Sequence, residues 1–128
     1  MQAIVIDDSR AMRSIIKCAL AAIGFECFEA ADGREALTKL AEHGRPPALA
    51  MVDWNMPNMN GLEFIEAVRA ARAFDEMRIV MVTTEVEMHQ VQAALEPGAT
   101  EYLMKPFNED ALVDKIRLLG LDQLKVAS

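Results

Sequence analysis

The sequence predicts an α/β domain in which helices cover both faces of one parallel β-sheet. Along the 128 residues, short apolar runs alternate with longer segments whose apolar residues recur at helical spacing, which is the βα pattern of a parallel sheet. Four of the runs end at polar residues, namely Asp7-Asp8, Asp53, Thr83-Thr84 and Lys105. Because ligands of open α/β sheets bind at the carboxyl ends of the strands, these residues are expected to share one pocket.

The first half of the chain contains three predicted strands and two predicted helices. The strands cover residues 3–6, 25–30 and 48–53. Ser9 suits the N-cap of the first helix and Gly24 ends it, while Asp32 and Glu35 form a capping-box pattern at the start of the second. Turn residues at 44–47 end that helix. The apolar positions expected to face the sheet are Met12, Ile15, Ile16, Ala19, Leu20, Ile23, Leu37 and Leu40.

The second half contains two more predicted strands and three more helices. These elements are a polar loop at 54–61, a helix at 62–68, strands at 78–82 and 100–104, and between the strands a weaker helix at 85–95 that ends at Pro97-Gly98. Asn108 suits the N-cap of a last helix, and Glu109 and Asp110 in its first turn match the helix dipole. The predicted buried side of that helix is Ala111, Leu112, Ile116 and Leu119.

Five strands and five helices account for residues 1–128, so a single domain without an output domain is expected. Right-handed crossovers restrict a doubly wound five-stranded sheet to a few strand orders, of which the flavodoxin-like order 2-1-3-4-5 is common. In that order the first and third strands are neighbours. Asp7, Asp8 and Asp53 would then meet where the strand order reverses.

Composition excludes several classes of protein. Thirteen basic and twenty acidic residues give a net charge of -7, which disfavours direct binding to nucleic acid or anionic membrane. No apolar stretch reaches the ~20 residues of a membrane-spanning helix, and the N-terminus does not resemble a signal peptide, so a soluble, cytoplasmic protein is expected. Cys18 and Cys27 show no metal-ligand or disulfide spacing and are predicted to be buried, reduced thiols.

The polar residues at the strand ends suit metal-dependent phosphoryl chemistry. An acid such as Asp53, directly after a buried strand, must be hydrated, paired or ligated, and three converging carboxylates would repel one another without a cation. Mg²⁺ prefers oxygen ligands of this kind. Lys105 could pair with a carboxylate or with a phosphate oxygen, and Thr83 could either cap the following backbone or join the site.

Four motifs resemble the response-regulator receiver domains of two-component signalling, along nearly the full chain. They are Val5-Ile6-Asp7-Asp8-Ser9-Arg10, Val52-Asp53-Trp54-Asn55-Met56-Pro57 with Gly61, Met81-Val82-Thr83, and Tyr102-Leu103-Met104-Lys105-Pro106-Phe107. The likeness is greatest to the stand-alone chemotaxis members. The resemblance implies that Asp53 is the phosphoacceptor, in a signalling domain rather than an enzyme acting on outside substrates.

The same resemblance assigns roles to the other site residues. It implies that Asp8, Asp53 and the backbone carbonyl of Asn55 ligate Mg²⁺, and that Asp7 reaches the ion through water. Thr83 and Lys105 would hold the phosphoryl oxygens. Thr83 and Tyr102 would form the switch, with the ring moving inward after phosphorylation, and the Lys105-Pro106 peptide bond would be cis. Asn55 and Glu85 match the chemotaxis type, which favours a short-lived signal.

The resemblance also implies protein partners. These are a sensor histidine kinase of the chemotaxis type or a histidine phosphotransfer protein, a possible phosphatase, and a target such as the flagellar motor switch. Receivers generally bind targets through the fourth helix, fifth strand and fifth helix, a surface that would include Glu87, Met88, Val91, Tyr102, Met104 and Lys115. The chain departs from the chemotaxis pattern at 85–88, where Glu-Val-Glu-Met replaces lysines, and this weakens the motor as the target.

Several alternatives stay open from sequence. A phosphorelay intermediate fits the same motifs. A magnesium-dependent aspartyl phosphohydrolase normally has a second acid where this chain has Asn55, and a flavodoxin-like electron carrier would need a hydroxyl-rich phosphate loop after the first strand. Trp54 is either packing or part of the site rim. Arg10 and Arg13 either meet a partner or are solvated helix charges, and Val86 and Met88 are either a docking patch or ordinary surface.

Overall fold

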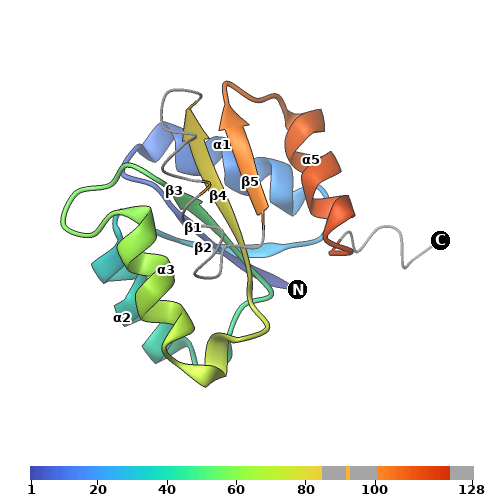
Figure 1. Cartoon of the computed structure of the whole chain (residues 1–128). Coiled ribbons are helices and arrows are strands. Elements are labelled where there is room, and N and C mark those ends of the chain that lie inside the picture. Colours follow the sequence, from blue (N-terminus) through green and yellow to red (C-terminus); the bar gives the residue numbers. More distant parts are fainter. Residues whose placement is uncertain (85–91, 93–100, 122–128) are drawn as a thin grey trace.

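The computed structural model, which describes residues 1–84, 92 and 101–121, contains one sheet of five parallel strands between two layers of helices (Figure 1). The strands are β1 (Gln2–Ile6), β2 (Glu26–Ala30), β3 (Leu49–Asp53), β4 (Arg78–Thr84) and β5 (Glu101–Lys105). Their order is β2-β1-β3-β4-β5, which confirms the predicted class and topology. Apart from residue 92, the helix predicted over 85–95 lies outside the described residues.

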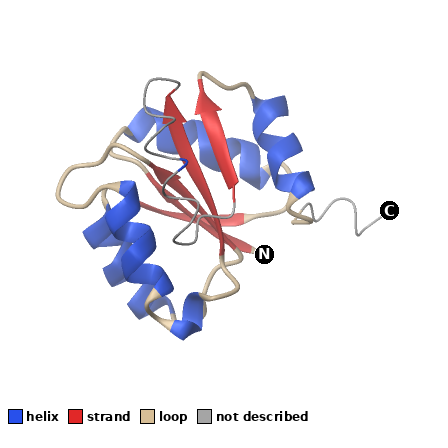
Figure 2. Ribbon diagram, viewed as in Figure 1, coloured by secondary structure: helices blue, strands red, loops and turns tan. Residues whose placement is uncertain are grey.

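Helices lie on both faces of the sheet (Figure 2). They are α1 (Arg10–Ala21), α2 (Gly33–His43), α3 (Gly61–Arg69) and α5 (Glu109–Leu118), with a short 3-10 helix, η1 (Arg72–Phe74), before β4. Side chains alternate along each strand between the two layers, so Ile4 and Ile6 pack toward α2 and α3 while Ala3 and Val5 pack toward α1 and α5. No helix in the described part of the chain has the length and apolarity that crossing a bilayer requires.

Side-chain caps fix where the helices start. Ser9 and Asp32 begin α1 and α2 as predicted, each accepting a hydrogen bond from a backbone N–H three residues later. Asn108 caps α5 in the same way. Asn60 and Glu63 form a complete capping box at the start of α3, at 2.9 and 3.1 Å. These caps set the four turns that follow the carboxyl ends of β1, β2, β3 and β5.

Burial on two helices differs from the prediction. Ile15 is 56% exposed and Cys18 is also exposed, although both were predicted to be buried. The buried face of α1 is formed by Ile16, Ala19 and Leu20. Because each residue turns the helix by about 100°, Ile15 lies at the edge of this face and Cys18 lies outside it. On α5, Ala111 is exposed and Val113 is buried for the same reason.

The prediction for Cys27 was also wrong, since this side chain is only half-buried. It lies on β2, which is one of the two edge strands of the sheet.

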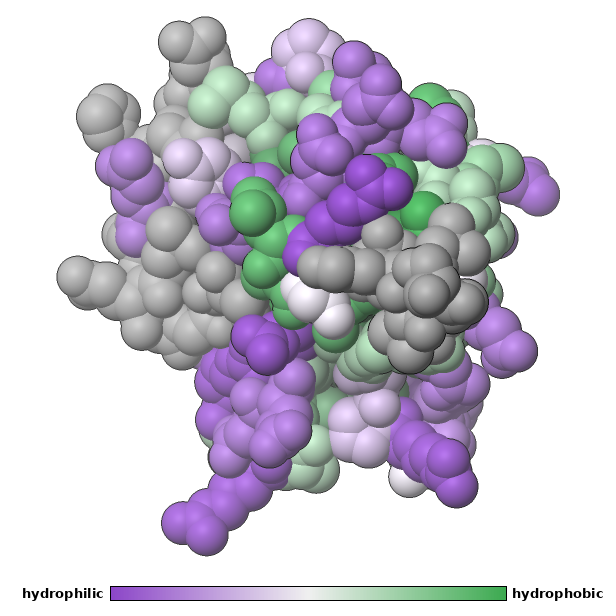
Figure 3. All heavy atoms as spheres, turned by 90° about the vertical axis from the view of Figure 1, so that its right-hand side faces the viewer, coloured by the Kyte–Doolittle hydropathy of each residue, from purple (hydrophilic) through white to green (hydrophobic). Residues whose placement is uncertain are grey.

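Seen from the α5 side, the surface is largely hydrophilic, with smaller apolar areas between the polar side chains (Figure 3).

The segments before and after α3 are more ordered than their composition suggests. Trp54 and Met56 are each only 7% exposed and join the core under α2 and α3, although residues 54–61 read as a polar loop. After α3, the Arg69 guanidinium donates to the carbonyls of Phe74 and Met77 at 2.6 and 2.7 Å. This holds the chain through η1 and leads it into β4, which runs two residues further than predicted.

Candidate functional site

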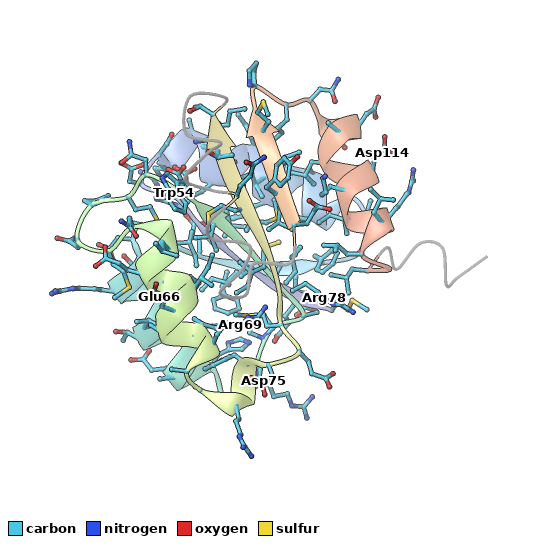
Figure 4. The ribbon with its side chains drawn as sticks, in the orientation of Figure 1. Trp54, Glu66, Arg69, Asp75, Arg78 and Asp114 are labelled. Atoms are coloured by element: carbon cyan, nitrogen blue, oxygen red, sulfur yellow. The ribbon has the colours of Figure 1, made fainter. Side chains whose placement is uncertain are left out.

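Three acids from two strands lie together at the carboxyl end of the sheet. Asp7 and Asp8 follow β1, Asp53 ends β3, and these strands are neighbours in register. One carboxylate oxygen from each acid lies within 4.8 Å of the others. The convergence predicted from the strand order is therefore present. Trp54 follows Asp53 at this end of the sheet, whereas Arg69 and Arg78 lie at the opposite end (Figure 4).

A single ammonium group faces two of these carboxylates. Lys105, at the end of β5, places Nζ 3.3 Å from Asp53 Oδ1 and 3.7 Å from Asp7 Oδ2. Both acids are nearly inaccessible, with 1% exposure for Asp7 and 6% for Asp53. The backbone N–H of Ser9 donates to Asp7 Oδ1 at 2.8 Å, but within the described part of the chain the buried Oδ2 atom of Asp7 accepts no hydrogen bond. One acceptor in the site is thus left unsatisfied.

Burial and mutual repulsion make the pair of buried acids hard to ionise. The pKa of Asp53 is raised to about 6, mainly by burial and then by the Asp7 carboxylate, while Lys105 opposes both effects. Burial also raises the pKa of Asp7. One lysine therefore does not balance the negative charge of the site. An all-oxygen donor set with an unsatisfied buried acceptor fits a hard divalent cation such as Mg²⁺.

The loop after Asp53 is fixed by main-chain hydrogen bonds. The backbone N–H of Trp54 donates to Val82 at 3.0 Å, and its carbonyl accepts from Gly61 at 3.0 Å. The Asn55 backbone N–H donates to the Asp53 carboxylate, which favours the ionised form. The Trp54 side chain packs in the core under α2 and α3, so of the two alternatives for this residue the structure shows packing.

The two candidate switch residues lie on neighbouring strands. Thr83 is 1% exposed on β4, and its hydroxyl donates to the carbonyl of Thr84 at 3.2 Å. Tyr102 on β5 is half-buried against the core under α2 and α3, and Lys115 Nζ lies 5.3 Å from the centre of its ring. At the end of β5 the Lys105-Pro106 peptide bond is cis.

Arg13 has contacts that the sequence did not indicate. Its side chain is only 14% exposed, so it is neither a solvated helix charge nor a free surface for a partner. Nε donates to Glu29 Oε1 at 2.8 Å, and Nη1 donates to the backbone carbonyl of Asp7 at 2.7 Å. A second carboxylate in the middle of a short strand, together with basic residues four apart on the preceding helix, is the signal that could have found the pairing of Arg13 with Glu29.

An apolar depression adjoins the acidic site. It measures about 380 Å³ and is lined by Met12, Ile15, Thr84, Lys105, Pro106 and Phe107. The lining residues come from α1, from the end of β4 and from the connection between β5 and α5. Lys105 thus contacts both the carboxylates and this apolar surface.

Comparisons with known proteins agree with the geometry. The chain is 42% identical over 120 residues to the chemotaxis protein CheY1 of Helicobacter pylori, a match that covers 93% of this chain and 96% of that protein. A CheY homolog of Campylobacter jejuni is 42% identical over 117 residues, covering 91% and 89%. Among solved structures, the chemotaxis response regulator CheY4 of Vibrio cholerae superposes with a TM-score of 0.84 at 36% identity, covering 92% of this chain and 97% of that one.

The family model described as the response regulator receiver domain matches residues 3–117. This span includes every residue of the acidic site and extends into the last turn of α5. The chain therefore belongs to the response regulator receiver domain family of two-component signalling.

Proposed function

We propose that this protein is a stand-alone response regulator that accepts a phosphoryl group on Asp53 from a histidine kinase, in a magnesium-dependent reaction. The observation that carries the proposal is the buried Asp53 carboxylate, which lies between Asp7, Asp8 and the Lys105 ammonium in a chain of the receiver family. The donor would be a CheA-like kinase or a histidine phosphotransfer protein, and the protein would act in the cytoplasm.

In the proposed reaction an ionised oxygen of Asp53 attacks the phosphorus of a phosphohistidine. The new bond joins that oxygen to phosphorus, the phosphorus–nitrogen bond breaks, and its electron pair stays on the imidazole nitrogen. Asp7, Asp8, Asp53 and the Asn55 carbonyl would hold Mg²⁺. The ion would neutralise the carboxylates and the phosphoryl oxygens, which is most of what phosphoryl transfer requires.

Two further side chains would bind the phosphoryl group. Lys105 Nζ already lies 3.3 Å from Asp53 Oδ1, and its ammonium would pair with a phosphoryl oxygen. The Thr83 hydroxyl would leave the Thr84 carbonyl, with which it now bonds, and donate to another oxygen. The space that it vacates would admit the Tyr102 ring, so a charge change at Asp53 alters the surface of β5.

We infer that the altered surface binds a protein target in chemotaxis or motility, such as the flagellar motor switch. Relatives named as chemotaxis proteins match nearly the whole chain. In the described residues this surface includes Tyr102, Lys115 and Met104, which is 38% exposed; the predicted contacts Glu87, Met88 and Val91 lie outside them. The apolar depression beside Lys105 offers the kinase, or a phosphatase, a contact next to the acceptor.

Mass spectrometry after incubation with acetyl phosphate and Mg²⁺ tests the proposal. The wild type should gain one phosphate, and neither Asp53→Asn nor a sample in excess EDTA should gain any. The matched control is Asp114→Asn, which makes the same chemical change at an exposed acid of α5 and should be phosphorylated normally. Folded wild-type protein that stays unmodified would refute the assignment, and transfer from Asp53 to a second histidine protein would identify a phosphorelay.

A further inference from the structure

The Arg13 side chain joins the edge of the sheet to the turn that carries two of the acids. From α1 its guanidinium reaches Glu29 on β2 at 2.8 Å and the Asp7 carbonyl at 2.7 Å. The Arg13 side chain is 14% exposed and the Glu29 side chain 33%, so both hydrogen bonds are partly shielded from water and are stronger than at an open surface.

The register of the sheet explains why Glu29 is available to Arg13. Glu29 pairs with Val5, whose side chain packs toward α1 and α5, so the carboxylate projects to the same side. Arg13 and Lys17 are four residues apart on α1 and meet it together. Hydrogen bonds from Lys17 and Arg13 lower the pKa of Glu29 to about 2. The carboxylate that anchors Arg13 therefore stays ionised throughout the physiological range.

The bond from Arg13 to the Asp7 carbonyl fixes a peptide plane. The carbonyl of Asp7 belongs to the planar peptide group that ends at the Cα atom of Asp8, so holding this oxygen also sets where the Asp8 side chain begins. The other side of Asp7 is tied by its backbone N–H, which donates to Ala30 at 3.1 Å. A side-chain donor at the Asp7 carbonyl and a main-chain acceptor at the Asp7 N–H thus orient the Asp7-Asp8 pair.

We infer that Arg13 is a positioning residue for the metal site, holding the Asp7-Asp8 peptide in the orientation that cation binding needs. The inference rests on the proposed magnesium-dependent function. Mg²⁺ demands near-ideal octahedral geometry, and loss of a group that orients a metal ligand typically weakens metal affinity by about 10-fold to 100-fold.

The sign of the effect separates positioning from electrostatics. Arg13 is a cation near an acidic site, so its charge alone repels Mg²⁺, and removing that charge should tighten binding if charge is all that matters. A positioning role requires the opposite result. Lys17 is the matched control, because it carries the same charge, lies on the same helix and binds the same Glu29 carboxylate, yet it donates no hydrogen bond to Asp7 among those found in the described residues.

Titration with Mg²⁺, followed by calorimetry and by the fluorescence of Trp54, tests the inference on wild type, Arg13→Gln, Arg13→Lys and Lys17→Gln. Thermal melts in EDTA report the stability of each variant separately. We expect the dissociation constant to rise about 10-fold or more in both Arg13 variants and to be unchanged or lower in Lys17→Gln. Arg13→Lys keeps the charge without the guanidinium fork, so it carries the test if Arg13→Gln does not fold.

Arg13 variants that bind Mg²⁺ as tightly as the wild type, or more tightly, would overturn the inference and leave the proposed function standing. A loss of affinity in Lys17→Gln equal to that in Arg13→Gln would overturn it as well, because the effect would then follow from the Glu29 contact alone. Wild-type protein that binds no Mg²⁺ would overturn the inference and the proposed function together.

Discussion

Replacing Asp53 with asparagine should stabilise the metal-free protein at neutral pH. Burial raises the pKa of Asp53 from the ordinary value of 3.8 to about 6, so the folded state holds this proton more tightly than the unfolded state. The stability from the protonated acid is fully present below about pH 4 and is lost as the pH rises through about 6. A difference of about two pKa units corresponds to about 3 kcal/mol. The asparagine side chain carries no charge at any of these pH values and avoids that loss.

Urea unfolding in EDTA measures the effect. At pH 7.5 the Asp53→Asn variant should be more stable than the wild type by about 3 kcal/mol, or roughly 10 °C in melting temperature for a domain of this size, and the advantage should shrink toward zero near pH 4. Asp114→Asn, at an acid whose side chain is 72% exposed, should change stability by less than about 0.5 kcal/mol. If the Asp53→Asn variant were less stable than the wild type at pH 7.5, the account of a site short of positive charge would be wrong.

Two further predictions concern the groups around Asp53. Lys105→Gln removes the ammonium group that lies 3.3 Å from Asp53, so the pKa of Asp53 should rise above its wild-type value. The free energy of unfolding of the metal-free protein at pH 7.5 should fall by about 2 kcal/mol, which is the usual contribution of a hydrogen bond to a charged group. Carboxylate NMR titration and urea unfolding check this, and an unmoved titration midpoint would contradict it. Gly61→Ala should cost about 1–3 kcal/mol, because the new Cβ would lie 2.9 Å from Met81 Sδ and 3.1 Å from the Trp54 backbone. For Gly33→Ala the three atoms nearest to the new Cβ all belong to the Met59 side chain, so this variant should cost less in the same unfolding assay, and equal losses would argue against the role of the backbone contact.

Strands, caps and acids were predictable because each has a local pattern. The first and third strands are continuous apolar runs that end in acids, and Ser9, Asp32 and Asn108 are capping residues beside helical periodicity. The contact between Arg13 and Asp7 was not predictable, because it depends on the register that brings Glu29 beside α1. Contacts of this kind depend on the strand register of the folded sheet, which the sequence pattern indicates only weakly.

The burial of Trp54 was hidden for a different reason. Its neighbours Asn55, Pro57, Asn58 and Asn60 make the segment read as a solvated loop, yet Trp54 and Met56 fill the space beside α3. The polar residues supply turns and a helix cap, while the two large apolar residues point inward. The average composition of the loop does not distinguish the two buried apolar residues from the polar residues that form the turns and the helix cap.

The electrostatic cost in the metal-free site would also favour the binding of a cation. Ionisation of Asp53 costs about 3 kcal/mol more in the folded protein than in the unfolded chain, and a divalent ion that relieved all of this difference would gain a factor of roughly 150 in binding. Lys105 already relieves part of the cost, so it competes with the ion for the same carboxylates. Cation binding would therefore release the Lys105 ammonium from Asp53 and Asp7, leaving it able to pair with an incoming phosphoryl group. In the proposed reaction the ion and Lys105 would therefore have different roles, because the ion would neutralise the carboxylates while Lys105 would pair with the phosphoryl group.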